Sequence, residues 1–211
     1  MKRNSKDYQL ALNHFLKYWA KFTIIQPYHA EWLSKYAKYA SYKRGACIYD
    51  FSWEEEKIIY VSQGILGRVN YYLDPKTLKD KRSILSIGLP HMALMTTYHL
   101  YSHNQAKSNI TALRKSHVLA ISYNRIKNFM RDDRSLDSIV GAWMNKKKHQ
   151  LARLRELNSC LDPQQSYLKF RKNMPELVAS LSQVEQQDLL GISRSSIRRA
   201  IYFDLTGKKI R

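Results

Sequence analysis

The segment from Ser182 to Arg199 constrains the fold more than any other part of this 211-residue chain. Its sequence, SQVEQQDLLGISRSSIRR, predicts two short helices separated at Gly191, because glycine readily adopts the left-handed backbone conformation that ends a helix. Ser193 is a favourable N-cap for the second helix. Ile192 and Ile197 are spaced so that both pack beneath the turn. We therefore predict a helix-turn-helix unit.

The second of these helices is rich in arginine and serine on the side that faces away from the turn. The residues expected to be exposed are Arg194, Ser195, Ser196, Arg198 and Arg199. A helix-turn-helix unit places such a helix in the major groove of DNA. Guanidinium groups on a short exposed helix therefore indicate double-stranded DNA as the partner.

The chain is strongly basic, with 36 Lys and Arg residues against 17 Asp and Glu residues and a formal net charge of +19 at pH 7. Such a protein is attracted to polyanions, which include nucleic acid, anionic membranes and acidic proteins. Charge alone does not choose among them, and solubility is an alternative explanation. The apolar content of 44% is enough for a substantial core in one large domain or two modest ones.

No apolar run approaches the roughly 20 residues that a membrane-spanning helix needs. Polar residues interrupt the stretch Tyr8–Phe22 behind the basic N-terminus, so we do not expect a secretory signal. Cys47 and Cys160 are far apart in the sequence, which is typical of a reducing compartment. We expect a cytoplasmic protein without a membrane partner, in which both cysteines are buried and neither is a ligand.

The first two thirds of the chain change from helical to strand periodicity. Residues 5–40 are expected to be helical, with a break at Pro27 and a second helix over roughly His29–Tyr39. From Tyr42 the pattern is that of short strands bounded by turns. The expected strands are 46–49, 58–62, 64–73, 82–87, 109–113 and 117–121. Strands at this spacing favour an antiparallel sandwich or barrel.

Helical periodicity returns at Ser122, with one short helix and then a long helix from Ser135 to Leu157. The long helix has an apolar side formed by Leu136, Ile139, Val140, Trp143, Gln150, Leu151, Leu154 and Leu157. Its spacing is close to that of a coiled-coil seam, which favours pairing of two copies of the chain. The alternative is an ordinary helix that faces its own core. Asp162–Pro163 marks a boundary before a small helical unit.

The order of these elements is similar to that of one protein family. A helical start, a small β-roll, one long helix and a C-terminal helix-turn-helix resemble the Crp/Fnr family of transcription regulators. The β-roll resembles the cyclic-nucleotide-binding-like sensor domain of that family. The matching segments are YKRG at 42–45, IIYVSQG at 58–64, the strands at 112–122 and GISRSSIRR at 191–199.

The resemblance implies an α+β fold with N-terminal helices and an antiparallel, jelly-roll-like β-roll. Residues 1–131 would form this sensor domain, 132–159 the long dimerisation helix, and 160–211 the helix-turn-helix DNA-binding domain. Only a short segment follows the second helix of the motif, so we expect little or no β-wing. The family also implies a homodimer that reads a two-fold symmetric site through the helix 193–202.

The resemblance assigns roles to individual positions of the last helix. Arg194, Ser195 and Arg199 match base-contacting positions, and Ser193 and Ser196 match positions that touch phosphate. The chemistry agrees, because a guanidinium matches the two acceptors on the edge of guanine. Further phosphate contacts are expected from Arg198, Lys208, Lys209 and Arg211.

The roll departs from the family's cyclic-nucleotide signature. That signature needs a glutamate after a glycine and an Arg-Ser pair that clamps the phosphate. Here LPHMAL follows Gly88 without a glutamate, and Lys107-Ser108 stands in place of Arg-Ser. Lysine meets phosphate as a point charge and not as a bidentate fork. We expect a regulator that does not depend on cyclic AMP, with Gly88, Lys107 and Ser108 marking a candidate effector pocket whose ligand is unknown.

The first helix of the motif also departs from the family. Gln186 and Gln187 occupy positions where the family has an apolar and a small residue beneath the turn. Burying an unpaired amide costs about 1–3 kcal/mol. Either the tips of these side chains reach solvent, or the unit is less tightly built.

No catalytic constellation, phosphate-binding glycine loop or paired-cysteine motif is present. His99 and His103 have the i, i+4 spacing of a helical metal site, but surface or packing roles are favoured. The acidic run Glu54–Glu56 is typical of a solvated loop. We therefore expect no enzyme activity, no cofactor and no metal.

Two functional hypotheses remain from the sequence. The leading one is a homodimeric DNA-binding transcription regulator. The alternative is a diverged regulator that acts as a protein-interaction module, with its basic surface on an acidic partner or on RNA polymerase.

Overall fold

The computed structural model describes residues 5–75 and 78–208 of the chain. The helices in these residues are α1 (Lys6–Trp19), α2 (Pro27–Tyr36), α3 (Tyr123–Asp132), α4 (Ser135–Asn158), α5 (Pro163–Asn173), α6 (Pro175–Ser180), α7 (Gln183–Leu190) and α8 (Arg194–Thr206). The strands are β1 (Lys38–Tyr42), β2 (Cys47–Tyr49), β3 (Lys57–Gln63), β4 (Leu66–Leu73), β5 (Asp80–Gly88), β6 (Ala93–Met95), β7 (Asn109–Ala112) and β8 (Ser116–Ser122). This is the α+β class that the sequence predicts, with helices, antiparallel strands, a long helix and further helices in that order.

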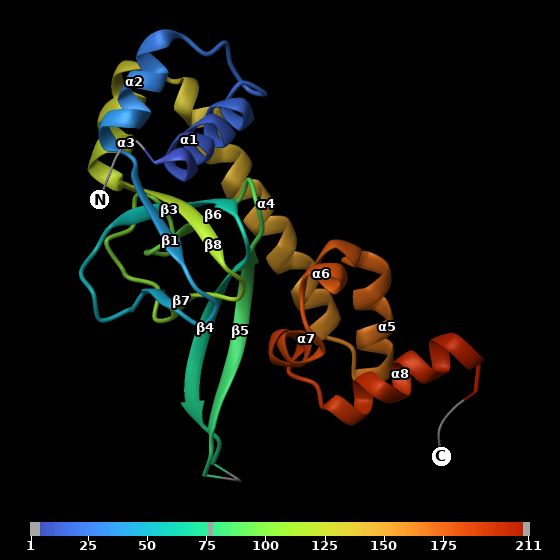
Figure 1. The fold of residues 1–211 in the computed structure, drawn as a ribbon. Helices are drawn as coiled ribbons and strands as arrows, with labels where there is room; N and C mark the ends of the chain where they lie inside the picture. The colour runs from blue at the N-terminus through green and yellow to red at the C-terminus, as the bar shows by residue number, and fades with distance from the viewer. Residues whose placement is uncertain (1–4, 76–77, 209–211) are drawn as a thin grey trace. The chain divides into compact units, whose positions relative to one another are not determined.

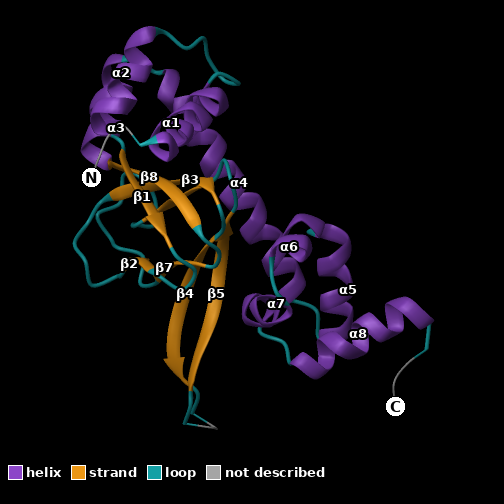
Figure 2. Ribbon diagram, viewed as in Figure 1, coloured by secondary structure: helices purple, strands orange, loops and turns teal. Residues whose placement is uncertain are grey.

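The strands form two four-stranded sheets within the described residues (Figure 2). One has the order β1-β8-β3-β6 and the other the order β2-β7-β4-β5. β8 pairs antiparallel with both β1 and β3, so that Ala120 lies opposite Lys38 on one side and Ile59 on the other. The turn between β3 and β4 requires glycine at position 64. Gly64 has φ +90°, and a Cβ added there would lie 2.3 Å from the carbonyl oxygen of Lys115. The sequence prediction of an antiparallel roll is confirmed.

The chain divides into two compact units that share α4. One unit contains the residues up to Arg68 together with Ile87–Lys146. The other contains Val69–Ser86 and the residues from Lys147 onward. The three-part division at 132 and 160 stays a prediction.

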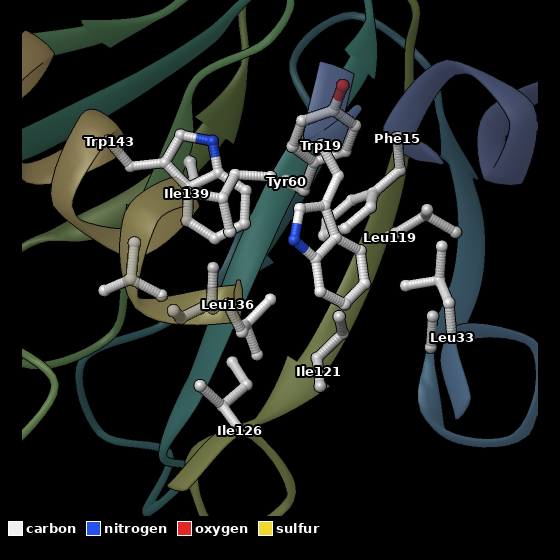
Figure 3. Packing of buried hydrophobic residues seen from close by; sticks show 14 of the residues in the cluster. Phe15, Trp19, Leu33, Tyr60, Leu119, Ile121, Ile126, Leu136, Ile139 and Trp143 are labelled. Carbon is white, nitrogen blue, oxygen red and sulfur yellow. The ribbon is translucent and has the colours of Figure 1, made fainter. Parts of the chain in front are cut away.

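An aromatic cluster forms the main core of the first unit. The helices α1, α2 and α3 lie together beside the β1-β8-β3 sheet (Figure 1). Figure 3 shows Phe15 of α1, Tyr60 of β3 and Trp143 of α4 side by side in this core. The centre of the Phe15 ring lies 4.7 Å from the centre of the Tyr60 ring and 5.7 Å from that of Trp143. Both pairs have edge-to-face geometry. Edge-to-face pairs of this kind stabilise a fold beyond the area that they bury.

The second unit has its own core beneath α5–α8. Its buried apolar residues include Leu154, Leu157, Tyr167, Phe170, Met174, Leu177, Leu181, Leu189, Leu190, Ile197 and Ala200. Asp162 caps α5 by accepting a hydrogen bond from the backbone of Gln164 at 2.9 Å. Pro163 and Pro175 occupy the first turns of α5 and α6, where a missing N–H costs nothing.

In the first unit, two strands form that the sequence does not predict, and one helix ends earlier than predicted. The helix predicted to reach Tyr39 ends at Tyr36, because residues from Lys38 onward pair with β8. The short strand β6 was not predicted, and it forms through pairing with β3. In both places hydrogen bonds to a distant strand outweigh the local pattern.

The apolar side of α4 is covered by the chain itself. Leu136, Ile139 and Trp143 are at most 2% exposed, and Leu157 is 1% exposed. Of the eight residues predicted to form a coiled-coil seam, only Leu151 is not fully buried. These side chains therefore fit the alternative interpretation, in which the helix packs against the core of its own chain.

Two other expectations of the sequence are tested by the fold. The expected burial of the cysteines is wrong, since Cys47 is exposed and Cys160 is partly exposed. Within residues 5–75 and 78–208, no helix combines the length and the hydropathy needed to cross a membrane.

A polar cluster joins α2 to the start of α4. Asp133 accepts hydrogen bonds from Tyr28 and from the backbone N–H of Ser135, the latter at 2.7 Å. The buried imidazole of His29 lies 3.1 Å from the same carboxylate and 3.0 Å from the Ser135 hydroxyl. Burial alone would raise the pKa of Asp133, but the hydrogen bonds from Tyr28, Ser135 and His29 outweigh it and lower the pKa to about 2.

We predict that Asp133→Asn destabilises the protein by about 1.5–3 kcal/mol at neutral pH, the range for hydrogen bonds to a charged group. Because the pKa of Asp133 is lower in the folded state than its ordinary value of 3.8, the stabilisation by this carboxylate is present above that value and is lost as the pH falls through about 2. Urea unfolding at several pH values measures the free energy of unfolding. The difference between variant and wild type should narrow between about pH 5 and about pH 1.

Asp132→Asn is the matched control, because Asp132 is exposed and its one ion pair among the described residues is with Arg131. Its effect should stay below about 0.5 kcal/mol. A difference for Asp133→Asn that is independent of pH would contradict the assignment.

Candidate nucleic-acid interface

The helix α7 is closed at both ends by local interactions. Ser182 accepts a hydrogen bond from the backbone N–H of Glu185 at 3.3 Å, and the Glu185 carboxylate accepts one from the backbone N–H of Ser182 at 2.8 Å. This is a capping box. Gly191 ends the helix with φ +65° and ψ +24°, the left-handed conformation that the sequence predicts there.

The helix α8 begins at the predicted cap. The Ser193 hydroxyl accepts a hydrogen bond from the backbone N–H of Ser196 at 3.1 Å and lies 2.8 Å from the hydroxyls of Ser195 and Ser196. Ile197 and Ala200 are fully buried and fix the inner side of α8. The helix continues to Thr206, one turn beyond the predicted end at 202, and Gly207 caps it with φ +68°. No β-wing occurs in the described residues after α8.

The outer side of α8 carries the residues that the sequence assigns to DNA. Arg194, Ser195, Arg198 and Arg199 are exposed, and Ser193 is exposed at the cap. Because residues four apart on a helix share a side, Arg194 lies beside Arg198, and Ser195 beside Arg199. None of the three arginines forms an ion pair with another described residue. Their guanidinium groups are therefore free to meet an anionic partner. Lys208 is exposed, and Lys209 and Arg211 lie outside the described residues.

The helices beneath this surface are held by polar contacts as well as by the core. Arg171 of α5 forms an ion pair with Asp204 of α8. Arg82 of β5 donates a hydrogen bond from Nε to Asp188 of α7 at 2.6 Å. These acids are therefore engaged with other arginines and do not neutralise the arginines of the α8 surface.

Gln186 corrects the sequence expectation for the motif. Its side chain is buried, at 4% exposure, so its tip does not reach solvent. Its Nε2 donates to the carbonyl oxygens of Val178 and Leu181 at 3.1 and 2.9 Å, and its Oε1 accepts from the Tyr167 hydroxyl at 2.8 Å. The amide is therefore hydrogen-bonded on both ends, and it joins α7 to α5 and α6. Gln187 is partly exposed.

The candidate effector residues of the roll lie in different surroundings. Gly88 packs closely on Leu94. A Cβ added to Gly88 would lie 3.2 Å from the side chain of Leu94. Lys107 lines a cavity of about 580 Å³ with Phe51, Tyr98 and neighbouring polar residues. Ser108 is buried and accepts a hydrogen bond from Arg68 at 2.9 Å.

Sequence reasoning missed Arg68, whose guanidinium lies inside the roll. The residue is 5% exposed, and it donates to Ser108 and to the backbone carbonyl of Met95. Its Nε has no hydrogen-bond partner among the described residues. Burial lowers the pKa of Arg68, while the nearby Tyr123, Tyr49 and Tyr98 raise it. An arginine between two apolar strand positions was the signal in the sequence, but the strand pattern alone did not indicate that it points inward.

The metal site considered for two histidines is not formed. His99 and His103 lie in turns and not on a helix, and His103 pairs with Glu56 at 2.9 Å. No group of three or more potential metal ligands occurs in the described part of the chain.

No family model matches the sequence, and no curated protein matches it either. Solved structures do resemble the fold. FixK2 from Bradyrhizobium japonicum matches with a TM-score of 0.64 at 16% identity, over 81% of this chain and 86% of that one. A transcriptional regulator of the Crp/Fnr family from Eubacterium rectale matches with a TM-score of 0.60 at 16% identity, over 90% of this chain and 89% of that one.

The chain has the Crp/Fnr fold. A third structure of this fold is the regulator CLP of Xanthomonas campestris, described as responsive to c-di-GMP. It matches with a TM-score of 0.64 at 12% identity, over 86% of this chain and 93% of that one. The resemblance that the sequence suggested is therefore confirmed at the level of the fold.

We predict that Gln186→Ala destabilises this Crp/Fnr fold by about 1–3 kcal/mol, because the carbonyl groups of Val178 and Leu181 and the hydroxyl of Tyr167 lose a buried partner. Urea unfolding of the full chain measures the change.

Gln187→Ala is the matched control on the same helix, since Gln187 is partly exposed. Its effect should stay within about 0.5 kcal/mol. Equal effects of the two substitutions would show that the hydrogen bonds of Gln186 do not hold the helices together.

Proposed function

We propose that this protein is a DNA-binding transcription regulator that acts as a homodimer on a two-fold symmetric site, and that it is not an enzyme. The observation that carries the proposal is the α8 surface, on which three exposed arginines have no acidic partner among the described residues. The Crp/Fnr fold of the chain supports it, because the similar structures include named transcription regulators.

The residues of α8 have two roles in this proposal. Arg194 and Arg199 read guanine edges in the major groove, where a guanidinium donates to two acceptors at once. Ser195 lies between them and contacts the adjacent base. Ser193, Ser196 and Arg198 hold the phosphate backbone and set the register of the helix.

The homodimer requires a surface of α4 that is exposed in the single chain. Because the apolar side of α4 is already buried, the two copies pair along the opposite, exposed side. That side carries Ser138, Gly141, Asn145, Lys148, Ala152 and Arg155, all exposed. Their alternating spacing of three and four residues is that of a helix–helix seam. Small residues such as Gly141 and Ala152 let two helices approach closely.

The regulator does not depend on cyclic AMP in this proposal. Ser108, one of the candidate effector residues, already accepts a hydrogen bond from Arg68. The Arg68 side chain fills the space beside Ser108 inside the roll, and the glutamate that would meet a ribose is missing after Gly88. RNA polymerase is a further candidate partner of the regulator.

The alternative, a protein-interaction module, has lost part of its support. The unusual Gln186 is fully hydrogen-bonded, so the motif is tightly built.

We predict that Arg194→Ala and Arg199→Ala each weaken binding to the preferred duplex by about 1–3 kcal/mol and relax its sequence choice. The preferred duplex is first selected from a random pool, and a two-fold symmetric sequence is expected. Fluorescence anisotropy then measures the affinities.

Arg131→Ala on α3 is the matched control, because it removes the same charge from an exposed position far along the sequence. Its affinity for the selected duplex should equal that of the wild type. Affinity for random duplex should fall steeply with salt, and an excess of cyclic AMP should change neither curve. Absence of duplex binding even at low salt would favour the protein-interaction alternative.

We predict that Gly141→Glu and Ala152→Glu each convert the dimer to a monomer. Each substitution places a carboxylate in the seam, where it repels the same carboxylate of the second copy. Sedimentation equilibrium should give twice the 24.9 kDa chain mass for the wild type and the single chain mass for both variants. A Cβ at Gly141 meets nothing within 4 Å in its own chain, so the monomer fold tolerates the change.

Asn124→Glu, at an exposed position of α3, is the control and should remain dimeric. Variants at 141 and 152 that keep the dimer mass would place the interface elsewhere.

A further inference from the structure

The first unit contains a second, larger cavity that is separate from the roll interior and from α8. Its volume is about 660 Å³, within the range of pockets that hold small molecules. Residues from α1, α2, β1, the start of β3, the end of β8 and α3 line it. All of these elements belong to the same compact unit, so the pocket is formed within one body.

Tyrosine rings form part of the wall of this pocket. Tyr8, Tyr36 and Tyr39 all line it. The hydroxyl of Tyr8 donates to the carbonyl oxygen of Ser34 at 3.0 Å, and the hydroxyl of Tyr39 bonds with His117. Because these hydroxyls already have partners, the two side chains offer mainly their rings to an occupant. Aromatic rings of this kind pack well against a flat aromatic ligand.

The acidic residues of the pocket already have partners and are outnumbered by basic ones. Glu55 forms an ion pair with Lys57, which also lines the pocket. Glu56 accepts a hydrogen bond from the imidazole of His103 at 2.9 Å. Against these two carboxylates the lining has four basic side chains, so it favours an anionic ligand over a cationic one.

The remaining basic residues have no such partner. Lys35, Lys38 and Arg125 line the pocket and form no ion pair with any described residue. The guanidinium of Arg125 lies 4.6 Å from the centre of the Tyr36 ring, and the ammonium group of Lys35 lies 5.3 Å from the same centre. These cation–π contacts hold both groups beside the ring without cancelling their charge.

We propose that this pocket binds a flat aromatic molecule that carries a carboxylate or phosphate group. The ring of the ligand lies against the tyrosines, and its anionic group meets Arg125 and Lys38. Charge-assisted hydrogen bonds from a guanidinium fork to such a group are stronger than neutral ones. The site is independent of the proposed DNA contacts of α8 and is tested without DNA.

The test uses 1-naphthyl phosphate and 1-naphthoate as probes on the full-length protein, with isothermal titration calorimetry as the measurement. Neutral 1-naphthol and inorganic phosphate separate the contributions of ring and charge. Both aromatic anions are expected to bind at least about tenfold more tightly than either partial probe, a free-energy difference of about 1.4 kcal/mol. The stronger of the two anions identifies the preferred acid group.

Arg125→Ala and Lys38→Ala are each expected to weaken binding of the aromatic anions by about tenfold, and Arg125→Lys should weaken it less than Arg125→Ala. Lys115→Ala is the matched control. It removes one exposed positive charge from the turn between β7 and β8, which does not line the pocket, and should leave the affinity unchanged. Thermal unfolding of each variant verifies that the fold is intact, and Lys38→Ala remains informative if Arg125→Ala unfolds.

Three outcomes would overturn the proposal. One is the absence of binding by either aromatic anion. Another is binding of 1-naphthol as tight as that of the anions, which would assign the pocket to neutral ligands. The third is an equal loss in Lys115→Ala and Arg125→Ala, because binding would then follow only the net charge of the protein.

Discussion

The packing of the first half of α4 against α1 and the β-roll is the interaction on which the rest of the structure depends. The rings of Trp143 and Phe15 pack edge-to-face with their centres 5.7 Å apart, and the ring of Tyr60 of β3 packs against both. Trp19 adds a hydrogen bond from its indole N–H to the carbonyl oxygen of Ser135 at 3.2 Å, directly at the first residue of α4. A long helix held in this way has one side committed to the core and only the other available to a partner.

This commitment changes the meaning of the heptad-like spacing in α4. The same spacing that is typical of a coiled coil is also typical of a helix buried in its own domain, because both need an apolar residue every three or four positions. Here the apolar side is used internally, and the side left open carries Ser138, Gly141, Asn145 and Lys148. In the proposed dimer, a seam of small and polar residues would give weaker pairing than one of leucines.

The roll and the helix-turn-helix treat buried polar groups in different ways. Gln186 is buried with a partner for both ends of its amide, which makes it a specific link between helices. Among the described residues, Arg68 is buried with only neutral acceptors and an unpaired Nε. Burial without a carboxylate is costly for a charge. The first arrangement stiffens the unit that carries α8, whereas the second places a charged group inside the roll at a cost in stability.

The sequence by itself determined the parts of this protein that depend on neighbours in the chain. The left-handed turn at Gly191, the caps at Ser182 and Ser193 and the exposed arginines of α8 follow from a few consecutive residues, because capping and helical periodicity act over one or two turns. Only the tertiary structure decided what covers the apolar side of α4, where the amide of Gln186 finds its partners and how Lys38 and Arg125 come to line one pocket. Those contacts join residues far apart in the sequence, and no local pattern records which distant strand or helix will supply the other half.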